Sequence, residues 1–147
     1  SDTDAAVSVS ENLINNFGRG GRYHGGGYFD YSEDGEKTLW PKLYELYHKP
    51  DVQISQQDMK DRLLFRQVIE SLKCLQEGVL RTVADGNIGS IMGIGAPPWT
   101  GGFIQFVNTY GIDRFITRCE SLAASYGERF EPPAIVSEYA SNGRLFL

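Results

Sequence analysis

The sequence has few of the residues that build metal centres and disulfide frameworks, with two cysteines and two histidines in 147 residues. Cys74 and Cys119 lie far apart, each within a stretch of helical periodicity. This placement favours two reduced, buried thiols of a cytosolic protein over a disulfide. The histidines and cysteines are not spaced as metal ligands are, so we expect no structural zinc site and no other metal.

Long apolar runs and an excess of positive charge are also missing. No stretch approaches the ~18 apolar residues that a membrane-spanning helix requires. The 14 lysines and arginines are outnumbered by 19 aspartates and glutamates, and the net charge of −5 argues against a broad nucleic-acid-binding surface. With 41% hydrophobic and 22% charged residues, the chain has the composition of a soluble globular domain. We expect a cytoplasmic location, with a mitochondrial or peroxisomal one as the alternative in a eukaryote.

Hydrophobic residues recur at helical spacing along most of the chain, and no run combines strand alternation with turn signals on both sides. Ser55 is expected to cap the longest helix, with Asp58 in its first turn. The predicted fold class is therefore all-α, a bundle of about seven helices. The segments are 5–17, a short helix after Pro41, 56–76, 79–84, 101–109 with Thr100 as its cap, 113–126, and a last helix from Pro132-Pro133 to Asn142-Gly143.

Glycine is the residue present in excess, 17 of 147, and it gathers in two clusters. The first, Gly18–Gly27, follows a predicted helix and leads into aromatic residues. A dinucleotide-binding turn would instead follow a strand and open a helix, and an RNA-binding Arg-Gly segment would repeat more often than the single Arg19-Gly20-Gly21. The cluster is best interpreted as a loop that ends a helix.

The second cluster, Gly86–Gly102, includes Gly101 and Gly102 in the expected first turn of a helix. This position could hold an anion, although close backbone packing is the favoured interpretation. Asp61 and Arg62, near the start of the long helix, are candidates to bind a phosphate or carboxylate, or to form a structural salt bridge. His24, His48 and Cys74 have no partner at a catalytic spacing. The residues alone therefore define no catalytic constellation.

Several segments together resemble one family. They are Asp61–Phe65, Glu70–Leu80, Ala84–Gly102, Gly21–Tyr31 and Tyr126–Phe130 followed by Pro132-Pro133. The chain is similar over nearly its whole length to the C-terminal helical part of 3-hydroxyacyl-CoA dehydrogenase, whose fold is shared with 6-phosphogluconate dehydrogenase. In particular it resembles the last segment of the multifunctional β-oxidation proteins that join enoyl-CoA hydratase to this dehydrogenase.

The resemblance implies a domain organisation. In the multifunctional members this helical domain occurs twice, so residues 1–50 are expected to be the tail of a first copy plus a connector. Residues 51–147 are expected to be the second copy. The first copy of the family carries an Asn-Arg pair where this chain has Asp61-Arg62, which supports the second-copy assignment and weakens any direct substrate role. Ala96 stands where the second copy usually has Phe, a difference that leaves a small void or is filled by Trp99.

The resemblance also implies a function. The family transfers a hydride from a 3-hydroxyacyl-CoA to NAD⁺ with a His–Glu base, and both that pair and the NAD site belong to a domain not represented here. No catalytic, cofactor-binding or metal residue is therefore assigned to this chain. Asp61, Arg62, Trp99, Gly101 and Gly102 are the candidates for lining the substrate cleft or for packing. The expected role is support of inter-domain packing and of the acyl-CoA cleft. The expected partners are the missing domains, the acyl-CoA substrate of the parent protein and, for the isolated piece, a second copy. The alternative is a free-standing acyl-CoA-binding or dimerisation module.

Overall fold

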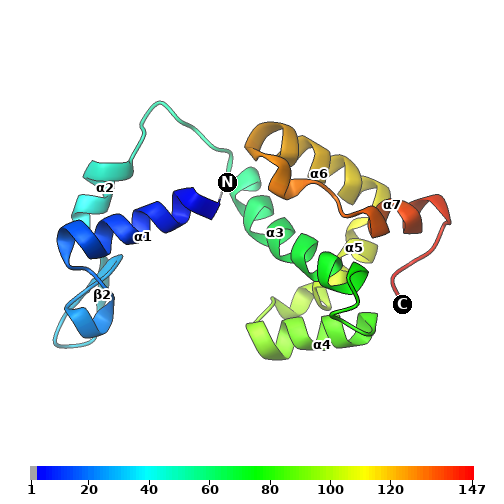
Figure 1. Cartoon of the computed structure of the whole chain (residues 1–147), viewed down its shortest axis with the longest axis horizontal. Coiled ribbons are helices and arrows are strands. Elements are labelled where there is room, and N and C mark those ends of the chain that lie inside the picture. Colours follow the sequence, from blue (N-terminus) through cyan, green and yellow to red (C-terminus); the bar gives the residue numbers. More distant parts are fainter. Residues whose placement is uncertain (1–2) are drawn as a thin grey trace. The chain divides into compact units, whose positions relative to one another are not determined.

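The computed structural model describes residues 3–147, which form seven α-helices and one two-stranded sheet (Figure 1). The predicted all-α class is confirmed, because helices account for all of the larger packed elements. The chain divides into two compact units, Ser1–Gln53 and Ile54–Leu147. Each unit has its own set of internal contacts.

The first unit contains two helices and a hairpin. Its elements are α1 (Thr3–Phe17), a 3-10 turn η1 (Arg22–His24), β1 (Phe29–Tyr31), β2 (Lys37–Leu39) and α2 (Pro41–Tyr47). The strands pair antiparallel, with Phe29 opposite Leu39 and Tyr31 opposite Lys37. The expectation of no strand was wrong here. Strands of three residues are too short to show alternation, and only their pairing defines them.

The first glycine cluster wraps around the guanidinium group of Arg19. The Nε atom donates to the Gly27 carbonyl at 2.7 Å, and Nη2 donates to the Phe29 carbonyl at 3.1 Å and to Asp30 Oδ1 at 2.5 Å. The guanidinium carbon also lies 4.3 Å from the centre of the Trp40 ring. The helix α1 ends before Gly18, whose φ is +67°, as the interpretation of a helix-ending loop predicted. These contacts of Arg19 are all with residues of the first unit.

The second unit is a helical bundle around α3. Its elements are α3 (Gln56–Gln76), α4 (Val83–Ile94), η2 (Pro98–Thr100), α5 (Phe103–Tyr110), α6 (Ile112–Tyr126), η3 (Glu128–Phe130) and α7 (Ala134–Ser141). Figure 1 shows α3 in the middle of this unit, where it packs against all four of the other α-helices. The Ser55 hydroxyl accepts from the Asp58 N–H at 3.0 Å, which confirms the predicted cap. Phe65 is fully buried and stacks on Phe115 at 4.8 Å, so α3 and α6 share the core.

Helix α4 begins later and runs further than the sequence suggested. The prediction of a helix over 79–84 followed by a glycine-rich turn was wrong, because the helix is Val83–Ile94 and contains Gly86, Gly89 and Gly93. Thr82 caps it by accepting from the Asp85 N–H at 3.0 Å. Each interior glycine costs about 1 kcal/mol relative to alanine. Gly86 is required by packing, since a Cβ there would lie 2.4 Å from Ile104 Cδ1. Contact with α5 therefore outweighs local propensity.

Side chains from α4 cap the N-terminal end of α5. The predicted cap, Thr100, accepts only from the Gly102 N–H, at 3.1 Å, and the helix begins at Phe103. Asn87 Oδ1 accepts from the N–H groups of Ile104 at 3.1 Å and Gln105 at 2.8 Å. Ser90 Oγ, which is buried, accepts from the Phe103 N–H at 3.1 Å. The cap is thus tertiary, because its acceptors come from a different helix.

This cap predicts a specific loss of stability. Asn87→Ala removes the acceptor of two N–H groups at the start of α5 and should lower the free energy of unfolding by about 1–2 kcal/mol, the usual cost of losing a helix cap. The measurement is the urea midpoint followed by far-ultraviolet circular dichroism. Met92→Ala, on the exposed side of the same helix, is the matched control and should change stability by less than about 0.5 kcal/mol. Equal losses for the two variants would contradict the cap.

Candidate functional site

The two candidate residues near the start of α3, Asp61 and Arg62, point in different directions. The Asp61 side chain is buried and accepts from Arg118 Nε at 2.7 Å and from Gln57 Nε2 at 2.8 Å. The guanidinium carbon of Arg62 lies 4.4 Å from the centre of the Tyr126 ring. The pair therefore does not act as one anion-binding unit, and both side chains are engaged within the chain.

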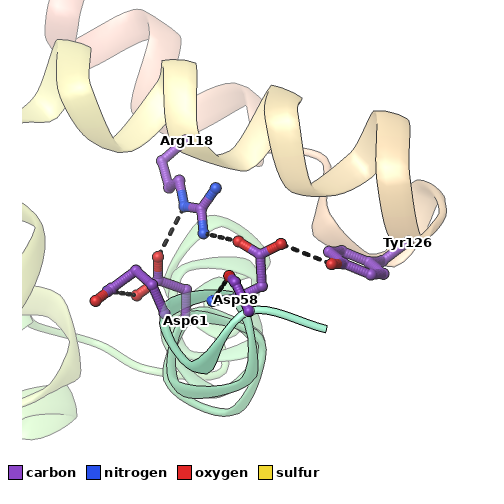
Figure 2. A network of polar contacts seen from close by, with 6 residues as sticks. Asp58, Asp61, Arg118 and Tyr126 are labelled. Atoms are coloured by element: carbon purple, nitrogen blue, oxygen red, sulfur yellow. Dashed lines mark hydrogen bonds and ion pairs between the residues drawn. The ribbon is translucent and has the colours of Figure 1, made fainter. Parts of the chain in front are cut away.

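Asp61 belongs to a polar network between α3 and α6, formed by Asp58, Asp61, Arg118 and Tyr126 (Figure 2). Arg118 Nη2 donates to Asp58 Oδ1 at 2.5 Å, and the Tyr126 hydroxyl donates to Asp58 Oδ2 at 2.6 Å. One guanidinium thus joins two carboxylates that lie one turn apart on α3. Since every member already has a partner, the arrangement is a clamp between two helices and leaves no free base.

The hydrogen bonds of the network stabilise the charged carboxylate of Asp58, the charged guanidinium of Arg118 and the protonated hydroxyl of Tyr126, and they shift the three pKa values accordingly. Hydrogen bonds from Tyr126 and then from Arg118 lower the pKa of Asp58 below its usual value of 3.8. The same bond to Asp58 raises the pKa of Tyr126 above 10.0. The sequence did not reveal this network, because Arg118 and Tyr126 lie 57 or more residues along the chain from the carboxylates.

The other three candidates lie at the η2 turn. The Trp99 ring is 70% exposed and meets the Phe106 ring edge-on, with the ring centres 6.1 Å apart. Ala96 is buried. Gly101 and Gly102 have φ values of +70° and +108°. A Cβ on Gly102 would lie 2.5 Å from Asn87 Cα, so these glycines provide turn geometry and close packing.

The start of α5 cannot hold an anion while the cap is in place. Each N–H group from Gly101 to Phe106 donates to an acceptor of the chain itself. A phosphate at this position would have to displace Asn87 and Ser90. The packing interpretation of the second glycine cluster is therefore the one that agrees with the geometry.

A groove of about 510 Å³ brings two of the candidates together. It lies between α3, η2 and α5, and we name it the Trp99 groove; its walls include Lys60, Leu63, Leu64, Pro97, Trp99 and Phe106. Asp61 also lines it, whereas Arg62, Gly101 and Gly102 do not. The sequence signal for the groove was Trp99 itself, while Lys60 and Leu63 were missed because nothing in their pattern marks them out.

The remaining candidate nucleophiles and bases are placed apart from this groove. His24 and His48 are exposed in the first unit, and His48 stacks on Tyr44 at 4.0 Å between ring centres. Both cysteines are free thiols; Cys119 is buried, and burial raises the pKa of its thiol to about 12. Cys74 is only half-buried and lines a second groove, between α3 and α4. Within residues 3–147, no three metal-ligating side chains converge, and no helix has both the length and the apolar character needed to cross a bilayer.

Comparison with known proteins identifies the larger protein to which this chain is related. No protein-family model matches the chain. It is 31% identical over 135 residues to the fatty acid oxidation complex subunit alpha of Vibrio parahaemolyticus serotype O3:K6 (strain RIMD 2210633), which covers 91% of this chain and 19% of the relative. The subunit of the same name from Vibrio campbellii (strain ATCC BAA-1116) is 32% identical over 139 residues, 94% of this chain and 20% of the relative.

The chain therefore spans about a fifth of the length of the curated relatives that it matches. A third such subunit, from Vibrio vulnificus (strain CMCP6), is 32% identical over 135 residues, which are 91% of this chain and 19% of the relative. The chain corresponds to one region of a larger fatty acid oxidation complex alpha subunit. The predicted relation to the multifunctional fatty-acid oxidation proteins is confirmed at this level.

The lowered pKa of Asp58 predicts a pH dependence of stability. A carboxyl group with a lower pKa in the folded than in the unfolded chain stabilises the fold above its unfolded pKa, near 3.9, and loses this effect as the pH falls through its folded pKa. Tyr126→Phe removes the hydroxyl that contributes most, so its urea midpoint should fall less steeply than that of the unmodified chain as the pH is lowered from 5 to 2.5. Tyr23→Phe, at a fully exposed tyrosine of the first unit, is the matched control and should leave the slope unchanged. Identical slopes for Tyr126→Phe and the unmodified chain would contradict the network.

The burial of the two thiols predicts their order of reaction. With Ellman's reagent at pH 8, Cys74 should react in the folded chain, whereas Cys119, with its pKa raised to about 12, should react only after unfolding. Cys74→Ser should abolish the reaction in native buffer and leave one thiol in denaturant. Rapid labelling of Cys119 in the folded Cys74→Ser chain would show that the second unit opens more easily than its packing indicates.

Proposed function

We propose that this chain is the C-terminal helical part of the 3-hydroxyacyl-CoA dehydrogenase portion of a fatty acid oxidation alpha subunit. In this role it supports the packing of neighbouring domains and one side of the acyl-CoA cleft, and it performs no chemistry alone. The proposal rests on the structure of the segment from Ala84 to Gly102. The residues on which the family resemblance is strongest form most of α4 and the η2 turn, and Asn87 among them caps the start of α5.

The surface of α4 supports the packing role. Ile88, Met92 and Ile94 are 63%, 82% and 68% exposed, and Asp85 is the only charged residue of the helix. A Cβ placed on Gly89 or Gly93 would meet nothing within 4 Å, so another backbone can approach closely there. An exposed, nearly uncharged helix surface of this kind is typical of a contact with another domain. In an isolated chain the same surface would favour self-association.

The two units support the assignment of residues 1–50 to the tail of a first copy and 51–147 to a second copy. In both units a helix is followed within two residues by a glycine of positive φ and then an arginine: Gly18-Arg19, with φ +67°, follows α1, and Gly143-Arg144, with φ +61°, follows α7. In both, the arginine N–H donates back to a helix carbonyl at 2.9 Å. Both guanidinium groups also lie over an aromatic ring, at 4.3 Å for Arg19 and 4.6 Å for Arg144. Equivalent ends are what a repeated domain would have.

The chemistry of the proposed parent protein requires parts outside this chain. Its NAD and its catalytic residues are assigned to another domain, and its location is proposed to be cytoplasmic. Asp61, Arg62, Trp99, Gly101 and Gly102 are proposed as cleft or packing residues, of which Trp99 has the most exposed side chain available for contact. The alternative, a free-standing module that holds an acyl-CoA phosphate at Asn87–Gly102, has less support, because the N–H groups there are already bonded.

The proposal predicts activity only in the larger protein. The 147-residue chain should produce no NADH from a 3-hydroxyacyl-CoA and NAD⁺, whereas the same chain joined to the upstream region of its alpha subunit should do so, as measured by absorbance at 340 nm. Met92→Glu places a charge on the α4 surface and should reduce activity or assembly of the joined protein, with Glu120→Gln on an exposed position of α6 as the control. NADH formation by the isolated chain would overturn the proposal.

A further inference from the structure

The first unit has almost no hydrophobic core of its own. Among residues 7–53, whose burial the structure describes, Leu13 is the one buried hydrophobic side chain, and the other buried hydrophobic residues lie in the second unit. A unit of this size buries little apolar surface even when its core is complete. One buried leucine cannot offset the conformational entropy that two helices and a hairpin lose on folding. The first unit therefore needs apolar contacts from outside itself.

Four exposed apolar side chains mark where such contacts would be made. Ile14, Tyr28 and Tyr31 line one recess of about 360 Å³ between α1 and β1, and Val7 lies two turns before Ile14 on the same side of α1. We name these four residues the α1 face; each is between 37% and 52% exposed. The hydroxyl of Tyr28 is bonded to the Ser10 hydroxyl at 2.9 Å within the unit. The α1 face is therefore suited to an apolar partner.

The second unit shows what covers a helix of this kind. Gly143-Arg144 follows α7 as Gly18-Arg19 follows α1, and the two arginines make matching contacts with the preceding helix and with an aromatic ring. Helix α7 packs against both α3 and α6 and buries Val136 completely. Within the described residues of the first unit, α1 has only the short helix α2 beside the hairpin. The cover that α1 lacks is thus a pair of helices like α3 and α6.

This pair has to come from outside the 147 residues. The α3–α6 surface of the second unit is already occupied by α7, and Gln76 of α3 also accepts from the Ile135 N–H at 2.9 Å. The chain spans about a fifth of the length of its curated relatives, which leaves ample sequence in those proteins for a second pair of helices.

We infer that the α1 face docks on an apolar pair of helices from the preceding part of the same alpha subunit, and that the first unit folds only against this pair. The inference rests on the proposed function, which assigns residues 1–50 to the tail of a first copy. It deepens that assignment by naming the docking surface, the kind of partner and the dependence of folding on it.

Hydrogen exchange measured by mass spectrometry compares the two units within one chain. In the isolated chain, the amides of α1 should exchange within about tenfold of the rates of an unfolded chain, and those of α3 should be at least about a hundredfold better protected. In the chain joined to the upstream region of its alpha subunit, the protection of α1 should rise at least about tenfold. Two concentrations of the isolated chain are compared, so that any self-association is detected.

A variant of the α1 face separates docking from the stability of α1 itself. Because Ile14 is exposed and alanine favours helices, Ile14→Ala should not speed the exchange of α1 in the isolated chain. In the joined protein it should speed this exchange about tenfold, since it removes an apolar side chain that the partner covers. Leu46→Ala, at a similarly exposed position of α2 outside the α1 face, is the matched control and should have no effect in either protein.

Three outcomes would overturn the inference. The first is equal protection of α1 and α3 in the isolated chain at both concentrations, because the first unit would then fold alone. The second is protection of α1 that rises with the concentration of the isolated chain, because a second copy would then be the cover. The third is no gain in the joined protein. A joined protein that protects α1 but makes no NADH would refute the proposed function alone, and one that makes NADH with α1 unprotected would refute only this inference.

Discussion

The hydrogen bonds from the start of α5 to Asn87 and Ser90 of α4 are the constraint on which the second unit depends. They bring the two helices so close that Gly102 has no room for a side chain beside Asn87. With the backbone held in this way, the η2 turn leaves Trp99 exposed and the Trp99 groove forms along α3. The same bonds use the N–H groups that would otherwise attract an anion. A glycine-rich segment that resembles a phosphate loop in composition is therefore a packed helix junction.

The second constraint is the polar network that joins α3 to α6. Arg118 holds Asp58 and Asp61 from the opposite helix, and Tyr126 completes the set of bonds to Asp58 (Figure 2). Because the network is partly exposed, its contribution to stability is modest and depends on pH. Two carboxylates share one guanidinium, so the network keeps a net negative charge at this end of α3.

The second unit combines this network with apolar side chains that the rest of the chain leaves uncovered. The exposed side of α4 and the Trp99 groove are two of the places where apolar side chains remain uncovered in the second unit. The chain spans about a fifth of the length of the fatty acid oxidation complex alpha subunits that it matches, and under the proposed function neighbouring domains would cover such surfaces. In the first unit, Arg19 donates hydrogen bonds to Gly27, Phe29 and Asp30 and so holds the first strand of the hairpin in place.

The sequence by itself determined the helices whose signals are local. Periodicity and the Ser55 cap located α3, and Gly18, Gly111 and Gly127 marked helix ends, because each depends on hydrogen bonds within a few residues. The family relation was also readable from the sequence, since it rests on an ordered string of residues. The sequence did not locate α4, because three glycines disfavour a helix unless another helix packs against them.

Only the tertiary structure decided the roles of the candidate site residues. Asp61 and Arg62 are neighbours in the sequence, yet one is bound by Arg118 and the other lies on Tyr126, both from α6. Lys60 and Leu63 became part of the Trp99 groove only when α3 was placed beside the η2 turn. Local patterns report on bonds between near neighbours along the chain. Partners that lie tens of residues apart are chosen by the packing of whole helices, which no short pattern contains.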